Sequence, residues 1–166
     1  MIAVPVELDT GGIAARLGLA VLLGAVVGLN RDIHHKPAGL RTHAIVALGA
    51  AMVTLTGVLL SAGTADATAV TRIVQGIVTG VGFIGGGVIL RRTDPMGVHG
   101  LTTAATIWVV AALGIACGAG QIALALIAFG LMLAVLVIGG PIERRVHRWL
   151  AVDSDKDSPA SHSDVT

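Results

Sequence analysis

Five apolar runs, each about twenty residues long, constrain this chain more than any other feature of its sequence. They cover residues 11–29, 44–62, 70–90, 102–118 and 121–140. A helix of about twenty apolar residues crosses the hydrocarbon core of a bilayer, which is roughly 30 Å thick. Inside lipid, every backbone polar group needs a partner within the protein, so each run is expected to be a helix. The sequence therefore predicts an all-α integral membrane protein with five transmembrane helices.

The charge content supports this class. Only 13% of the 166 residues are charged and 54% are hydrophobic, whereas about a quarter of the residues in a soluble domain are charged. So few charges cannot cover a surface that faces water. The net charge of +1 and the lack of any basic stretch interleaved with aromatic residues give no support to a nucleic-acid partner. The expected surroundings are the lipid bilayer.

The basic residues of the connections predict the orientation in the membrane. They fall after the first, third and fifth runs: Arg31, Lys36, Arg41, Arg91, Arg92, Arg144, Arg145 and Arg148. Because lysine and arginine gather in cytoplasmic connections, the N-terminus is expected outside and the C-terminus in the cytoplasm. We expect a transmembrane domain over residues 1–142. Residues 143–166 are expected to form a basic juxtamembrane segment and a disordered cytoplasmic tail.

The first connection, GLNRDIHHKPAGLRTH at residues 28–43, gathers polar side chains between two apolar runs. Pro37 and Gly39 favour a compact turn. Asp32 is expected to pair with a neighbouring lysine or arginine. The cluster is thus predicted to be a cytoplasmic turn that connects two spans.

Three histidines in this connection, His34, His35 and His43, raise the question of a metal site. Their spacing matches no standard transition-metal ligand set, and no Cys or Glu completes one. Magnesium prefers oxygen ligands, of which the short cytoplasmic connections offer only Asp32 and Asp94. The sequence leaves metal binding undecided and predicts no cofactor.

The third run carries polar residues and glycines at helical spacing. Arg72, Gln75 and Thr79 lie on one helical face together with Gly82 and Gly86. Glycines on this face and on a second face permit close helix contacts, so we expect the helix to lie centrally. The predicted helix-packing residues are Gly76, Gly80, Gly82, Gly85 and Gly86. The polar face is interpreted either as a packing surface or as a polar path.

Two further glycine motifs have simple interpretations. GVGFIG at residues 80–85 matches G-x-G-x-x-G, but it lies inside an apolar run and no acidic residue follows at the required distance. It is therefore not a dinucleotide fingerprint. In GVHGLTTAATIW, residues 97–108, Gly100 interrupts the chain and Thr102 or Thr103 is expected to cap the next helix. The start of that helix is also a candidate anion site, although capping alone explains the pattern.

Three segments, taken together, resemble one known family. They are RDIHHKPAGLRTHAIVALGAAMVTL, TRIVQGIVTGVGFIGGGVILR and GLTTAATIWVVAALGIACGAG. Over about residues 15–140 the chain resembles the MgtC/SapB family of bacterial inner-membrane proteins. The resemblance implies a five-span domain in the plasma membrane, associated with magnesium limitation, intracellular survival and virulence.

The resemblance also selects candidate functional residues. Asp32 matches the second acid of the family's acid-Arg-acid motif, whereas Asn30 replaces the first, which puts any role for paired carboxylates in doubt. The other matches are the Arg-Thr-His at residues 41–43 and the polar positions of the third and fourth runs. The candidates are Asp32, Arg41, Thr42, His43, Arg72, Gln75, Thr79, Thr102 and Thr103.

The sequence contains no recognisable catalytic arrangement, so an enzyme is not expected. The family resemblance implies a non-enzymatic regulator or accessory factor in magnesium and ion homeostasis and in stress or virulence adaptation. Small-residue faces favour a homodimer, and another membrane complex is the second kind of expected partner. The alternative is a Mg²⁺ or other ion transporter with a polar path along the third run and Asp32 at its cytoplasmic mouth.

Overall fold

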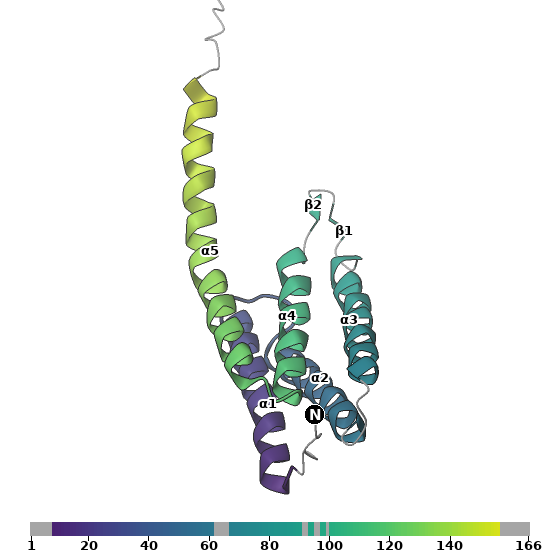
Figure 1. The fold of residues 1–166 in the computed structure, drawn as a ribbon. Coiled ribbons are helices and arrows are strands. Elements are labelled where there is room, and N and C mark those ends of the chain that lie inside the picture. Colours follow the sequence, from purple (N-terminus) through teal and green to yellow (C-terminus); the bar gives the residue numbers. More distant parts are fainter. Residues whose placement is uncertain (1–7, 62–66, 91–92, 95–96, 99, 157–166) are drawn as a thin grey trace, which may run out of the picture. The chain divides into compact units, whose positions relative to one another are not determined.

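Five helices make up almost all of the described chain. A computed structural model describes residues 8–61, 67–90, 93–94, 97–98 and 100–156. The helices are α1 (Thr10–Ile33), α2 (Leu40–Ser61), α3 (Ala67–Leu90), α4 (Leu101–Gly118) and α5 (Ile122–Lys156). Two-residue strands, β1 (Thr93–Asp94) and β2 (Gly97–Val98), pair antiparallel between α3 and α4 (Figure 1). All five helices contain a stretch long and apolar enough to cross a membrane, which confirms the predicted fold class.

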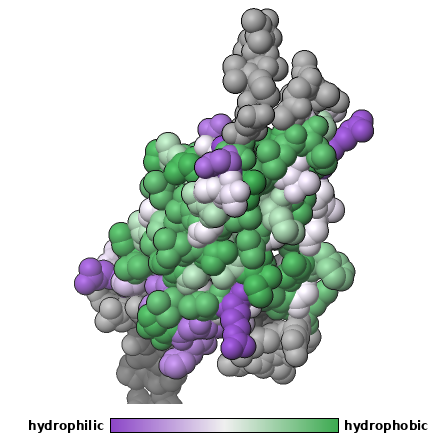
Figure 2. All heavy atoms as spheres, turned by 90° about the horizontal axis from the view of Figure 1, so that it is seen from below, coloured by the Kyte–Doolittle hydropathy of each residue, from purple (hydrophilic) through white to green (hydrophobic). Residues whose placement is uncertain are grey.

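Many large apolar side chains lie on the outside of the protein. Leu60, Phe83 and Leu90 are each at least 79% exposed. Figure 2 shows that hydrophobic atoms cover most of the face in view. A surface of this kind suits contact with lipid and not with water, because a water-soluble monomer rarely exposes a large continuous apolar patch.

The connection between α1 and α2 is shorter than the polar stretch in the sequence. Helix α1 continues to Ile33 and α2 begins at Leu40, so helical hydrogen bonding includes most of the charged residues. The turn between them contains His35 and Ala38 in the left-handed region, with φ of 50° and 58°. The Arg-Thr-His at residues 41–43 consequently lies in the first turn of α2 and not in a loop.

Helices α2 and α4 each pack against the other three of the first four helices, and α4 is the most buried of the four. A buried apolar cluster joins Ala50 of α2, Val81 of α3 and Ile107 of α4. Glycines of α4 let α2 approach closely, since a Cβ at Gly114 would lie 2.9 Å from that of Ala50. Small residues at helix contacts are the usual means of packing in a bilayer.

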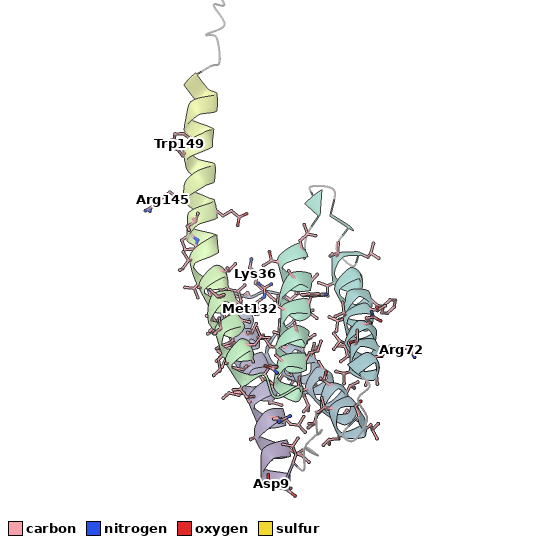
Figure 3. The ribbon with its side chains drawn as sticks, viewed as in Figure 1. Asp9, Lys36, Arg72, Met132, Arg145 and Trp149 are labelled. Carbon is pink, nitrogen blue, oxygen red and sulfur yellow. The ribbon has the colours of Figure 1, made fainter. Side chains whose placement is uncertain are left out.

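Helix α3 lies at the edge of this group, so the prediction of a central position is wrong for the single chain. It packs against α2 and α4, and the rest of its surface is open. Arg72 lies on the side of α3 that faces away from α4 (Figure 3). The glycine pattern indicates where another backbone fits, but it does not identify the helix that provides this backbone.

Helix α5 continues beyond its apolar stretch. The candidate span ends at Glu143, while the helix runs on through Pro141 and Glu143 to Lys156. Residues 151–156, which we expected to belong to a disordered tail, are therefore helical, and residues 157–166 lie outside the described part. The boundary between two compact units falls within α5, between Phe129 and Gly130.

Candidate functional site

Four buried polar side chains meet where α1 ends and where α2 and α4 begin. Arg31 belongs to the last turn of α1 and His43 to the first turn of α2, while Thr103 and Thr106 lie in the first turns of α4. Their exposed fractions are 5%, 0%, 2% and 3%, respectively. We call these four residues the polar cluster. In a chain with so few polar residues, this burial makes the cluster the main candidate site.

Hydrogen bonds connect the polar cluster across three helices. Arg31 Nη2 donates to Thr103 Oγ1 at 2.6 Å. Thr106 Oγ1 donates to the carbonyl oxygen of Thr103 at 2.8 Å. His43 Nε2 lies 3.1 Å from the same Thr106 hydroxyl oxygen. Because these bonds lie in a low-dielectric interior, they are electrostatically stronger than they would be in water.

The bonds of the His43 ring define its tautomer. Nδ1 lies 3.0 Å from the carbonyl oxygen of Gly39, which can only accept, so Nδ1 carries a hydrogen. In the neutral ring, Nε2 is then an acceptor, and the single hydrogen of the Thr106 hydroxyl goes either to Nε2 or to the Thr103 carbonyl oxygen. In the protonated ring, Nε2 donates to Thr106, whose hydroxyl still reaches the carbonyl of Thr103.

Two glycines of α1 allow α1 and α2 to touch next to the cluster. A Cβ at Gly24 would lie 2.6 Å from the carbonyl oxygen of His43, and one at Gly28 would lie 2.7 Å from the amide nitrogen of Leu40. Real side chains do not fit at such distances, so both positions require glycine. The backbones of α1 and α2 therefore touch, which places Arg31 beside the first turn of α2.

Arg31 retains an unsatisfied group. Its Nε is buried and has no hydrogen-bond partner, and within the described residues its guanidinium forms no ion pair with a carboxylate. A buried polar group without a partner costs roughly 1–3 kcal/mol, and a charged one more. The cluster therefore holds a cation whose charge the described side chains do not neutralise.

The Asp32 side chain bonds to the backbone at the start of α2. Its carboxylate is exposed, and Oδ2 accepts a hydrogen bond from the backbone N–H of Leu40 at 2.9 Å. It thereby satisfies a free N–H at the start of α2, as a capping residue does. Within the described residues, this backbone contact stands in place of the expected pairing with Arg31, Lys36 or Arg41, while the arginines at 91 and 92 lie outside the described part. Arg41 and Thr42 are exposed and do not belong to the cluster.

Neither predicted threonine caps α4, so that prediction is wrong. The residue before the helix is Gly100, with a φ of 93° and no side-chain cap. Glycine adopts this left-handed conformation readily, and it has no side chain with which to cap the helix. Thr102 is exposed in the first turn, while the hydroxyl of Thr103 accepts from Arg31.

The candidate residues of α3 are not part of the cluster. Arg72, Gln75 and Thr79 are all exposed, and Thr79 Oγ1 donates to the Gln75 carbonyl within the helix at 2.8 Å. A Cβ at Gly85 would contact Ala104 of α4 at 3.5 Å. The other four predicted packing glycines, Gly76, Gly80, Gly82 and Gly86, have nothing within 4 Å of such a Cβ. Their predicted role in helix packing stays a prediction.

Sequence reasoning missed two members of the cluster. Arg31 was assigned only to the basic cytoplasmic turn, and Thr106 was not singled out. One signal was present, because Thr103 and Thr106 are three residues apart and therefore share a helical face. The partner of that face could not be inferred from one helix alone.

The three histidines do not converge. His34 and His35 are exposed in the turn, and His34 Nδ1 lies 2.7 Å from the carbonyl oxygen of Asn30. His43 is buried in the cluster. In the described ranges, no group of three or more His, Cys, Asp or Glu residues is placed to hold a metal ion.

Five apolar helices with a buried polar cluster define a multi-pass α-helical membrane protein. The MgtC family matches residues 17–145, and this match includes the whole polar cluster. The chain belongs to the MgtC family.

Three relatives align with most of this chain. It is 44% identical to Protein SrpB of Synechococcus elongatus over 140 residues, which cover 80% of this chain and 76% of that protein. It is 42% identical to Protein MgtC of Brucella abortus and 41% identical to Protein MgtC of Salmonella typhimurium. Each of these two alignments covers 129 residues, or 78% of this chain. The chain spans about half the length of these MgtC proteins, 52% and 53% respectively. No solved structure matches the chain.

Proposed function

We propose that the chain is a non-enzymatic regulator or accessory factor in magnesium and ion homeostasis, and in stress or virulence adaptation, in the bacterial inner membrane. It acts by binding another transmembrane helix, and its first partner is a second copy of itself. One observation carries this proposal, which is the open face of α3, formed by Arg72, Gln75, Gly76, Thr79, Gly80 and Phe83. Membership of the MgtC family supports the physiological setting.

The open face of α3 is poorly suited to lipid. Polar and charged side chains within a span are costly, and they normally face other protein or water. Arg72 and Gln75 are exposed there, and within the described part of the chain no residue bonds to either side chain. Glycine costs helix stability, and in a membrane it is useful where another backbone comes close. Gly76 and Gly80 have open space instead.

A second copy fits this face because the face is self-complementary. Gly76 and Gly80 have the spacing that lets two membrane helices cross in contact. The Gln75 amide both donates and accepts, so two copies related by a two-fold axis pair with each other. Arg72 lies one turn nearer the end of the helix, from which its long side chain reaches the interface. Phe83, at 86% exposed, gains a protein contact in the same association.

The position of α3 bears on the transport alternative. A path through one chain would be lined by side chains directed toward the other helices, whereas Arg72, Gln75 and Thr79 are exposed on the outside of α3. A transporter would therefore need to build its path at an interface between chains. The exposed position of these side chains favours a role in contact between chains over a role in ion transport. The experiment below also measures transport.

The test uses the whole chain in lipid vesicles, with donor-labelled and acceptor-labelled copies mixed at decreasing protein-to-lipid ratios. We expect specific energy transfer for the unchanged chain and association weaker by about 5- to 150-fold for Gly80→Leu, since overpacking costs about 1–3 kcal/mol. The matched control is Gly18→Leu, because Gly18 is also exposed with nothing within 4 Å. Mg²⁺ uptake is measured in the same vesicles.

Each result decides one part of the proposal. Equal energy transfer for both glycine variants would remove α3 as the contact surface. Saturable Mg²⁺ uptake that Arg72→Ala abolishes in a folded chain would replace the regulator with a transporter. No uptake, together with the selective loss of association, is the result that the proposal predicts.

A further inference from the structure

Among the side chains that the structure describes, the buried positive charge of the polar cluster has no counter-ion. The Arg31 guanidinium is permanently charged, and its side chain is only 5% exposed. Its hydrogen bond within the described residues goes to a neutral hydroxyl, that of Thr103, and its Nε has no partner. Asp32, the adjacent carboxylate, is exposed and bonds to the start of α2. Buried charges are normally paired, so this arrangement calls for an anion.

The start of α4 adds a second positive feature at the same place. The first N–H groups of a helix have no partner within the helix, and the helix dipole is positive at this end. Here Gly100 provides no capping side chain. Leu101 and Thr102, the first two residues of this turn, are exposed. Thr103, which accepts from Arg31, is the next residue of the same turn.

The end of α1 compensates for only part of this charge. Arg31 lies in the last turn of α1, where the negative end of the helix dipole stabilises a cation by about 0.3–1 kcal/mol. The opposite dipole end of α4 offsets this benefit. At the first turn of α4, the Arg31 charge and the positive end of the α4 dipole both favour an anion.

We propose that the first turn of α4, together with Arg31, binds a phosphate group. The N–H groups of Leu101 and Thr102 and the Thr102 hydroxyl hold the phosphate oxygens, as helix N-termini hold phosphate in other proteins. Arg31, which bonds to Thr103 of the same turn, attracts the phosphate by its positive charge. The group comes from a phospholipid headgroup or from free phosphate. Both sources reach this turn, because the candidate spans of α1 and α4 end and begin here.

Two binding measurements on the purified full chain in a phosphate-free maltoside detergent distinguish the sources. Thermal unfolding is followed with increasing inorganic phosphate, against chloride at equal ionic strength. Native mass spectrometry compares retention of phosphatidylglycerol with that of a phosphate-free galactolipid. We expect a rise in unfolding temperature specific to phosphate, or selective retention of phosphatidylglycerol, depending on the source.

Substitutions test whether the phosphate binds at this site. Arg31→Gln keeps a donor for Thr103 and removes the charge, and it should weaken binding about tenfold through the lost attraction between opposite charges. Arg41→Gln removes an exposed arginine from the first turn of α2 and should leave binding unchanged. If Arg31→Gln does not fold, Thr102→Pro decides, because proline is tolerated in a first helical turn yet removes one N–H.

Three results would overturn the proposal. The first is that neither inorganic phosphate nor phosphatidylglycerol binds in preference to its control. The second is that Arg31→Gln, or Thr102→Pro in its place, binds as well as the unchanged chain. The third is that Arg41→Gln weakens binding as much as Arg31→Gln, which would indicate a general effect of basic charge.

Discussion

The Thr106 hydroxyl holds two helices together through one side chain. It lies between His43 Nε2 of α2 and the Thr103 carbonyl of its own helix, and Thr106 itself is 3% exposed. Sequence matching selected His43 and Thr103 as candidates but could not show that they are buried together. Their burial follows from the early start of α2 and from the close approach at Gly24 and Gly28, and neither is encoded in hydropathy.

Replacing Thr106 by valine tests this contact at the residue scale. Valine keeps the shape of threonine but leaves His43 Nε2 buried without its partner, so we expect a loss of about 1–3 kcal/mol in unfolding free energy. Reversible unfolding in mixed detergent measures it. Thr56→Val is the matched control, because Thr56 is exposed and bonds only to the Met52 carbonyl of its own helix. Equal losses in the two variants would show that the bond to His43 contributes nothing.

At the scale of elements, the contact between α2 and α4 illustrates what hydropathy reveals and what it omits. The apolar runs predicted that both helices exist and cross the membrane. They did not place the helix ends, because α1 and α2 continue through charged residues whose side chains reach a neighbouring backbone or helix, as those of Asp32 and Arg31 do. They also did not show which small residues touch. Gly114 and Gly118 of α4 meet the backbone of α2, whereas Gly49 of α2 meets nothing.

Two alanine substitutions distinguish a glycine that touches another backbone from a glycine with open space around it. A Cβ at Gly114 would collide with the carbonyl oxygen of Ala47, so Gly114→Ala should destabilise the protein by about 1–3 kcal/mol through overpacking. Gly49→Ala has open space and should be neutral or stabilising by up to about 1 kcal/mol, since alanine favours the helix. Unfolding in mixed detergent again provides the comparison. A stabilising Gly114→Ala would contradict the described contact.

At the scale of the whole molecule, the class was predictable and the arrangement of the helices was not. Five apolar runs are sufficient to infer five spans, because lipid leaves few other structures open to such a chain. Hydropathy cannot distinguish a helix face covered by lipid from one covered by protein, since lipid tails are as apolar as leucine. The predicted central helix, α3, therefore lies at the edge, while α2 and α4 each pack against the other three of the first four helices. The predicted orientation, with the N-terminus outside, stays a prediction.

The central claim is that the open face of α3 is a contact surface between copies, and cysteine cross-linking in the native membrane tests it most directly. Single cysteines are introduced along α3 of the full chain after Cys117 is replaced by alanine, and disulfide-linked dimers are measured after mild oxidation. We predict efficient cross-linking at Gly76, Gly80 and Phe83 on the open face. We predict little at Ile77 and Val81, which pack into the core. Uniform cross-linking along α3, or none above that of a cysteine at Gly18 of α1, would contradict the account.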